Sequence, residues 1–435
     1  MKPTKDLNEF LVRLSTANML TRVSHQVDHK YQLASLAFDF EKKRQGALLF
    51  ECVKGSNIPV VTNLFSELER TSLAFGIRQD ELHNHFSSAM NSRIKPTLVD
   101  VGRVQEKEAA SLDALPIPEN TQHDAGRYIT SILTTQESGV RVFQWARVEV
   151  KSASKVAVRV DPGRRLWDVT KDKERFDAAL IIGAPPSVEF AASVRGSTFD
   201  KLEMAGSLQG SSVDLVNCDT VNCEVPALSQ IVIEGVMDRG NTEPEGPFAE
   251  FTGYYSPSEP MPTFQVKKIT MRSDAVFRTV IGASAEHLAL NNVGREASLY
   301  DSLKRAVPGI VDVHLPPFGC GFIAFLSVRK EYVMMAKNAL LAALSAHPVV
   351  KYAIIVDEDV NIHDEREVLW AMATRSGGDE DLVIVPRAFN HALDPASIGG
   401  FVTKLGIDAT FPPDKRKLFK RVEYVSLDKF KASSS

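Results

Sequence analysis

The chain has 435 residues, of which 44% are hydrophobic and 24% charged, and its formal net charge is −4. At about 100–200 residues per domain this length predicts two or three domains, and the composition excludes a disordered or fibrous protein. The balance of 51 basic against 55 acidic residues and the lack of any apolar run of ~18 residues argue against nucleic acid and membranes as partners.

Residues 1–125 predict a small N-terminal α/β domain and a linker. The apolar positions at helical spacing in the first predicted helix are Leu7, Phe10, Leu11 and Leu14. Short apolar runs at 47–53 and 58–61 predict strands, and residues 66–75 predict a second helix. Residues 94–125 contain several prolines without sustained periodicity, which predicts a linker or an extended arm.

Residues 126–294 predict a mostly antiparallel middle domain that is interrupted by helices. Turn-forming residues separate apolar, β-branched runs there, as in consecutive strands. The predicted strands are 128–135, 140–150, 155–160, 178–182, 213–216, 231–237 and 263–272, and the predicted helices are 187–194 and 199–208.

Residues 295–435 alternate between helix and strand patterns, which predicts a compact C-terminal α/β domain with its own sheet. The predicted helices are 296–306, 333–344 and 365–373, and the predicted strands are 310–314, 322–328 and 350–357. Four scattered cysteines are too few for a disulfide scaffold, and together with the charged N-terminus they lead us to expect a cytoplasmic protein.

The segment most informative about chemistry is residues 243–255, EPEGPFAEFTGYY. Its prolines and glycines favour a tight loop that presents Glu245 and Glu250 five residues apart. A turn at Gly246-Pro247 could bring both carboxylates to one pocket, where their repulsion would suit one of them for proton delivery near neutral pH. The alternative is a surface turn whose acids are solvated.

In its surroundings this loop resembles the signature of the UbiD-like decarboxylases, which use prenylated flavin mononucleotide. The stretches that carry the resemblance are 46–56, 59–65, 231–235, 244–255, 356–360, 368–375 and 403–410, and they follow one another along the chain as in the family. The resemblance covers nearly the whole chain. It implies a middle domain shaped like a flavin-binding split barrel and a C-terminal α/β domain that mediates oligomerisation.

The resemblance also implies a non-oxidative, reversible decarboxylase of an aromatic, heteroaromatic or α,β-unsaturated carboxylic acid. Its catalytic residues fall on Arg147, Glu245 and Glu250, and we expect Glu250 to donate the proton that replaces CO2. Arg147 would bind the substrate carboxylate or orient Glu245. The same resemblance places Trp145 and Ala146 along the flavin. It also places Lys404 near the flavin phosphate.

The sequence departs from the family at the three residues that hold a divalent metal on the flavin phosphate. The family's Asn is Val142, its His falls on Arg164 or Arg165, and its Glu is Lys201. Valine offers no donor atom, and Arg and protonated Lys cannot ligate a metal, so we expect no divalent metal. Either these cations bind the phosphate directly in a metal-independent enzyme, or the flavin site has been lost.

In the second case the chain would be a cofactor-free acid–base enzyme of the same fold, or a non-catalytic partner subunit of an active paralogue. The presence of Arg147, Glu245 and Glu250 together favours an active enzyme. The expected partners are a small carboxylic acid, a second copy of the chain in a homodimer or larger homo-oligomer, and a flavin prenyltransferase that supplies the cofactor.

Overall fold

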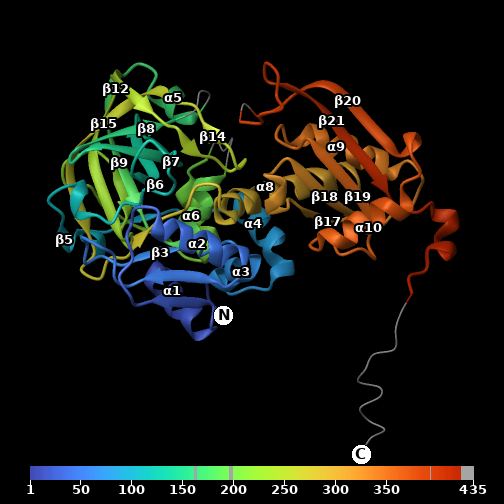
Figure 1. The fold of residues 1–435 in the computed structure, drawn as a ribbon, viewed down its shortest axis with the longest axis horizontal. Helices are drawn as coiled ribbons and strands as arrows, with labels where there is room; N and C mark the ends of the chain where they lie inside the picture. The colour runs from blue at the N-terminus through green and yellow to red at the C-terminus, as the bar shows by residue number, and fades with distance from the viewer. Residues whose placement is uncertain (161–163, 195–198, 392, 423–435) are drawn as a thin grey trace, which may run out of the picture. The chain divides into compact units, whose positions relative to one another are not determined.

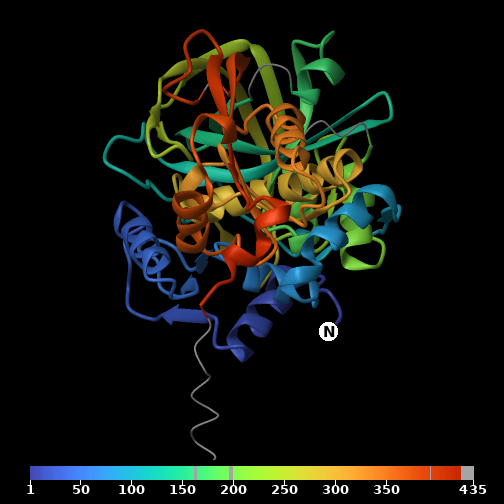
Figure 2. The ribbon, with the colours of Figure 1, turned by 90° about the vertical axis from the view of Figure 1, so that its right-hand side faces the viewer.

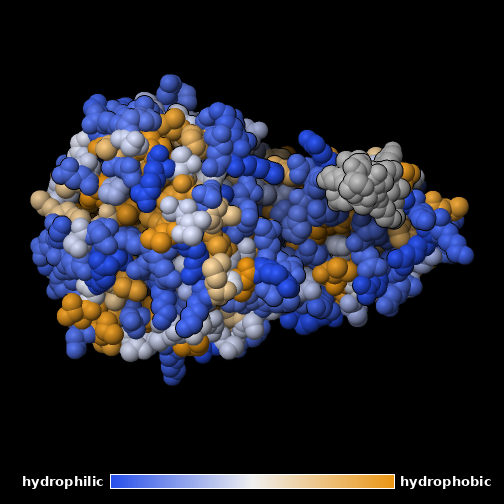
Figure 3. Space-filling view, turned by 90° about the horizontal axis from the view of Figure 1, so that it is seen from below, coloured by the Kyte–Doolittle hydropathy of each residue, from blue (hydrophilic) through white to orange (hydrophobic). Residues whose placement is uncertain are grey.

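The computed structural model describes residues 1–160, 164–194, 199–391 and 393–422, and the chain divides into two compact units, Met1–Ser298 and Leu299–Ser435 (Figure 1). The first unit contains the segments predicted as the N-terminal and middle domains. One face of the surface is mainly hydrophilic, with small and scattered hydrophobic patches (Figure 3). Among the described helices, none is long and apolar enough to cross a membrane.

A small sheet with helices around it begins the first unit. Helix α1 (Leu7–Thr16) starts after Asp6, whose carboxylate accepts a hydrogen bond from Glu9 N at 2.7 Å and so satisfies one N–H of the first turn. The predicted apolar stripe of α1 is buried. The strands, in sheet order, are β1 (Leu20–Val23), β2 (Ala47–Phe50), β3 (Val60–Thr62) and β16 (Phe277–Arg278), and the other helices are α2 (Gln32–Lys42), α3 (Leu68–Phe75) and α4 (Leu82–Asn91).

The middle of the first unit is a closed antiparallel barrel. Its strands are β6 (Tyr128–Glu137), β7 (Val140–Ser152), β8 (Lys155–Arg159), β9 (Arg175–Ile182), β12 (Ile231–Glu245) and β15 (Glu259–Met271). They pair in the order β12-β9-β6-β7-β8-β15, and β15 pairs back with β12, which closes the sheet on itself. All six strands contribute side chains to one buried cluster, which therefore fills the barrel. The predicted barrel-like middle domain is confirmed.

Strand β7 separates two environments by the alternation of its side chains. Val142, Ala146 and Val148 belong to the cluster inside the barrel, whereas Phe143 and Trp145 pack against a second cluster outside it. Successive side chains of a strand point to opposite faces, so odd-numbered positions of β7 face outward. Any site on the outer face of the barrel is therefore built from odd positions of this strand.

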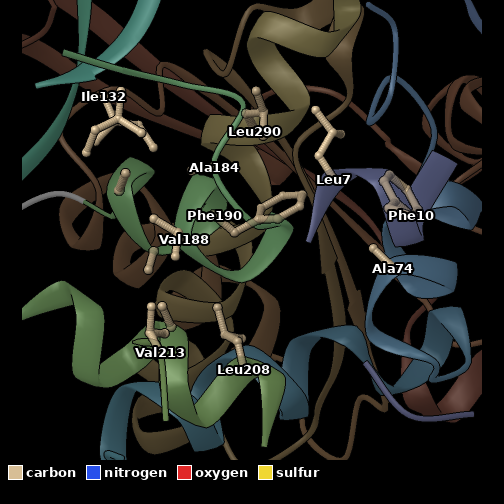
Figure 4. Packing of buried hydrophobic residues seen from close by; sticks show 14 of the residues in the cluster. Leu7, Phe10, Ala74, Ile132, Ala184, Val188, Phe190, Leu208, Val213 and Leu290 are labelled. Carbon is tan, nitrogen blue, oxygen red and sulfur yellow. The ribbon is translucent and has the colours of Figure 1, made fainter. Parts of the chain in front are cut away.

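The second cluster lies between the barrel wall and the helices, with Phe190 near its middle (Figure 4). Among the elements that line it are the helices α6 (Pro186–Ser193) and α7 (Lys201–Gln209) and the short strands β10 (Asp214–Asn217) and β11 (Glu224–Pro226). Helix α5 (Arg165–Val169) packs on the cluster inside the barrel, and the other short strands are β4 (Thr97–Leu98) and β5 (Lys107–Glu108). Strand β4 pairs with β10, and β5 pairs with β15. Residues 94–125 thus run along the unit as an extended arm.

Helix α8 (Ala285–Ala306) is longer than the predicted helix, which began at residue 296. Its first turn carries Glu286, which is fully buried and accepts two hydrogen bonds from Arg278, at 3.1 and 2.8 Å. Arg278 also lies 3.4 Å from the carboxylate of Glu189 in α6. Because polar residues occupy buried positions here, the helical repeat of apolar residues is lost from the sequence.

Glu189 is expected to make stability depend on pH. Burial raises its pKa to about 7, against an ordinary value of 4.5, although the charge of Arg278 opposes the shift. A raised pKa stabilises the folded state fully below pH 4.5, and this contribution is lost as the pH rises towards 7. Relative to wild type, Glu189→Gln should therefore gain stability across that interval and then level off. Urea unfolding midpoints of both proteins from pH 4 to 8 test this, and a constant difference would contradict it.

The second unit, orange to red in Figure 2, is built on one sheet with helices on both faces. In sheet order its strands are β17 (Ile310–His314), β18 (Ile323–Val328), β19 (Tyr352–Asp357), β21 (Phe401–Ala409) and β20 (Leu382–Phe389), and its helices are α9 (Met335–Ala346) and α10 (Glu365–Arg375). Helix α9 packs on Ala324 and Leu326, whereas α10 shares a cluster with Phe325. The alternation along β18 therefore places the two helices on opposite faces. The predicted C-terminal α/β fold is confirmed, although β20 and β21 were not predicted.

Candidate active site

The structure brings Arg147, Glu245 and Glu250 together. Arg147 lies in β7, Glu245 is the last residue of β12, and Glu250 follows β13 (Phe248–Ala249). Arg147 donates from Nε to Glu245 Oε1 and from Nη2 to Glu245 Oε2, both at 2.7 Å. Its remaining nitrogen, Nη1, donates to Glu250 Oε1. One planar guanidinium thus fixes both carboxylates, the first of them in a bidentate pair.

This group is withdrawn from solvent. Glu245 is 0% exposed and Glu250 is 8% exposed, so the alternative of a surface turn with solvated acids is wrong. Burial alone would lower the pKa of Arg147, but the hydrogen bonds and negative charges of the two glutamates outweigh it and raise the pKa. Arg147 therefore shares its charge between two carboxylates that are both withdrawn from solvent.

The loop that carries the two glutamates is held by hydrogen bonds to its backbone. Gly246 N donates to Glu149 Oε2 at 3.0 Å, and Ala249 N donates to Asp124 Oδ1 at 2.9 Å. Gly246 has φ of +93°, and a Cβ there would lie 2.8 Å from Pro257 O. Glycine is therefore required at this turn for two reasons, the backbone conformation and the space.

Tyr128 and Glu149 complete the support beneath the site, and the sequence analysis missed both. Tyr128 Oη donates to Glu149 Oε2 at 3.2 Å, and its ring lies 4.6 Å from that of Phe248. Burial, followed by the charges of Glu245 and Glu149, raises the pKa of Tyr128, so its hydroxyl stays protonated. The sequence signal for Glu149 was its odd position in β7, two residues after Arg147.

Arg159 is a second cation at the site that the sequence analysis missed. It lies directly opposite Arg147 in the ladder between β7 and β8. Its Nη1 is 3.8 Å from Glu245 Oε2 and 2.6 Å from Glu259 Oε2. The predicted strands 140–150 and 155–160 carry the two arginines, but which of their residues lie opposite each other depends on the register of the pairing, which the sequence does not show.

Trp145 and Ala146 lie beside Arg147 on the same strand but face opposite ways. Trp145 shares the outer face with Arg147, and its Nε1 donates to Glu189 O at 2.9 Å. The Ala146 side chain belongs to the cluster inside the barrel and is 6% exposed. If the flavin lies along the outer face of β7, Trp145 can contact it through its side chain. Ala146 can contact it only through its backbone. That both residues line the flavin stays a prediction.

The basic residues predicted to bind a phosphate begin the helices α5 and α7. Arg165 Nη1 donates to Phe199 O, shortly before α7, at 3.1 Å, and Lys201 Nζ donates to Ala192 O, in the last turn of α6, at 2.9 Å. Arg164 is the residue that caps α5. Val142 is 2% exposed inside the barrel. A valine and three cations do not suit a divalent metal, and no group of metal-binding side chains occurs among the described residues.

Lys404 lies in the second unit, on β21. Its Nζ donates to Leu344 O at 2.9 Å and to Pro348 O at 3.1 Å, and the residue is 3% exposed. Burial lowers the pKa of Lys404. These bonds give the lysine a structural role within its own unit, and its assignment to a flavin phosphate stays a prediction.

Family models for three domains match consecutive parts of the chain. The model described as 3-octaprenyl-4-hydroxybenzoate carboxy-lyase N-terminal domain matches residues 11–90, the Rift-related domain of the same enzyme matches 95–285, and its C-terminal domain matches 289–409. Together they cover most of the chain, and they place the candidate catalytic residues within the Rift-related domain.

Relatives and solved structures agree with these matches. The anhydromevalonate phosphate decarboxylase of Methanothermobacter thermautotrophicus is 31% identical over 92% of this chain and 96% of its own length. The UbiD-class enzyme HmfF of Pelotomaculum thermopropionicum, solved in complex with FMN, superimposes with a TM-score of 0.94 at 36% identity, covering 98% of both chains. The apo 3,4-dihydroxybenzoic acid decarboxylase of Klebsiella pneumoniae gives 0.92 at 25% identity, covering 99% of this chain and 100% of its own.

Proposed function

The chain belongs to the UbiD family of carboxy-lyases, and we propose that it decarboxylates an aromatic, heteroaromatic or α,β-unsaturated carboxylic acid with prenylated flavin mononucleotide and without a divalent metal. The observation that carries this proposal is the buried group in which Arg147 holds both Glu245 and Glu250. Burying charged groups costs desolvation free energy, and a subunit that only bound a partner would have no use for a buried cation with two carboxylates.

Each of the three residues has a part that follows from its contacts. Arg147 would bind the substrate carboxylate, since its guanidinium presents donors in a plane that matches carboxylate oxygens. Glu245, paired in bidentate fashion and 0% exposed, would keep Arg147 in place. Glu250 holds the arginine through one nitrogen only and is the more exposed acid, so it is the one placed to deliver a proton to the carbon that loses CO2.

The residues present fit a flavin whose phosphate is held by fixed cations. When bound, prenylated flavin supplies an electron sink for the carbanion-like centre that decarboxylation leaves. Trp145 would contact its ring system, and Arg164, Arg165 and Lys201 would hold its phosphate. Because all three are cationic and Val142 carries no donor atom, the side chains suit a phosphate and not the divalent metal that the family places there.

The relatives support the choice of cofactor and substrate class. HmfF has been solved with FMN and, in an evolved dimeric form that is 34% identical to this chain, with prenylated FMN. Two of the structural neighbours, at 25% identity, act on 3,4-dihydroxybenzoic acid and vanillic acid. We further propose that the chain works as a homodimer or larger homo-oligomer and receives its cofactor from a flavin prenyltransferase.

The proposal is tested by expressing the chain together with a flavin prenyltransferase and analysing the released ligand by absorption and mass spectrometry. We expect about one prenylated flavin per chain, no stoichiometric divalent metal, and retention of the flavin after dialysis against EDTA. Expression without the prenyltransferase is the control and should give no prenylated flavin. Loss of the flavin with EDTA, or no flavin despite a saturating supply, would overturn the metal-independent mechanism.

A further inference from the structure

Arg295, in the middle of α8, is buried without a counter-ion. It is 9% exposed, its Nε has no hydrogen-bond partner, and within the described part of the chain no carboxylate forms an ion pair with it. The other buried arginines differ. Arg272 pairs with Asp6 and Asp274, Arg278 with Glu286 and Glu189, Arg375 with Asp357 and Asp359, and Arg70 donates to Leu64 O.

A second cation lies near enough to affect Arg295. Burial and then the charge of Arg164 lower the pKa of Arg295 to about 10, so the side chain is still charged at neutral pH. Removing a guanidinium from water is costly unless an anion replaces the lost solvation, and a like charge nearby adds to the cost. A guanidinium that is buried without a partner is therefore best explained by an anionic ligand.

The backbone around Arg295 points to the same region as the other basic residues. Gly294 lies against Val194, since a Cβ on the glycine would be 3.3 Å from Val194 Cγ2. Lys201 reaches Ala192 O, two residues before Val194. Helix α8 thus brings Arg295 to the end of α6, where the cations that begin α5 and α7 also lie. Arg295 lies one residue before the predicted helix 296–306, and no motif marks it in the sequence.

We propose that Arg295 and Arg164 form an anion-binding pair that holds a single oxyanion, supplied either by the phosphate of the cofactor or by a second acidic group of the substrate. Guanidinium groups bind phosphate and carboxylate oxygens through paired N–H donors, so one pair of arginines suits both sources. The inference rests on the function proposed above, because that function supplies both candidate anions. It assigns Arg295, which the family resemblance did not mark, to the binding machinery.

The test uses the flavin-free protein and inorganic phosphate as the probe. At constant ionic strength, exchanging chloride for phosphate should raise the Tm of wild type by roughly 2–4 °C. This shift should vanish in Arg295→Gln and persist in Arg305→Gln, which removes an exposed arginine from the same helix. No shift in wild type, or an equal shift in Arg295→Gln, would overturn the proposal. Neither outcome depends on turnover or on prenylated flavin, so failure here is distinct from failure of the proposed function.

A second variant separates ligand binding from a structural role. Without any anion, Arg295→Met should raise the Tm above that of wild type, because it removes an unpaired buried charge. A structural arginine would give a lower Tm, which would contradict the proposal. Repeating the phosphate titration with saturating FMN identifies the source of the anion. Loss of the phosphate effect assigns the pair to the cofactor phosphate, and persistence of an Arg295-dependent effect assigns it to an acidic group of the substrate.

Discussion

Replacement of Glu250 by glutamine is expected to lower kcat by about 10²–10⁴-fold, the range that a positioned general acid contributes. Glutamine keeps the size of the side chain and can still meet Arg147, but it cannot give up a proton. The fold and the bound flavin should therefore be unaffected. Steady-state decarboxylation by flavin-loaded protein, with flavin content measured on the same sample, provides the comparison.

The matched control for this substitution is Glu259→Gln. Glu259 lies on β15, forms an ion pair with Arg159 at 2.6 Å, and has a side chain that is 45% exposed. It loses the same charge near the same site, yet it lacks the contact with Arg147, so its activity should stay within a few-fold of wild type. Equal losses in both variants would mean that the net charge of the region matters and that Glu250 is not the proton donor.

Replacement of Arg147 by methionine is expected to abolish turnover and to destabilise the first unit by about 3–5 kcal/mol. Methionine fills most of the space but leaves the carboxylate of Glu245, which is 0% exposed, without its bidentate partner. Arg159 lies 3.8 Å from Glu245 Oε2 and is already paired with Glu259, so it does not supply the two hydrogen bonds that Glu245 loses. Urea unfolding measures the loss of stability.

A double variant shows whether the loss of turnover and the loss of stability in Arg147→Met have separate causes. Adding Glu245→Gln to Arg147→Met removes the stranded charge, so most of the stability should return while the enzyme stays inactive. If the double variant were as unstable as the single one, packing and not charge would explain the loss. If it recovered activity, Arg147 would not be the residue that binds the substrate.

The barrel strands and the acidic loop could be predicted because each shows a local pattern, whereas the closed barrel and the role of Arg147 were implied only by the family resemblance. The alternating strands of residues 128–160 show their period directly, and the acidic loop carries its own turn residues. The sequence did not predict α2, the hairpin of β20 and β21, or the first half of α8. In α8 two buried partners of Glu286, Asn63 N and Phe65 N, come from a distant segment, so no local pattern reveals them.

The same reason explains which site residues were missed. Arg159, Tyr128 and Glu149 matter through pairing across strands, which depends on register. Arg295 matters through the absence of a partner, which a sequence cannot display. By contrast, Arg164, Arg165 and Lys201 were noticed because they stand where the family has metal ligands, although their role stays a prediction.

The alternation of side chains along β7 affects how this enzyme can evolve. Val142, Ala146 and Val148 belong to the barrel interior, while Trp145, Arg147 and Glu149 lie on the other face. Selection can therefore act on the outward positions without disturbing the interior that keeps the barrel folded. A one-residue insertion in this strand would exchange the two sets at once. Adaptation to a new acid should thus proceed by substitution at outward sites, and a directed library confined to them should retain a high proportion of folded clones.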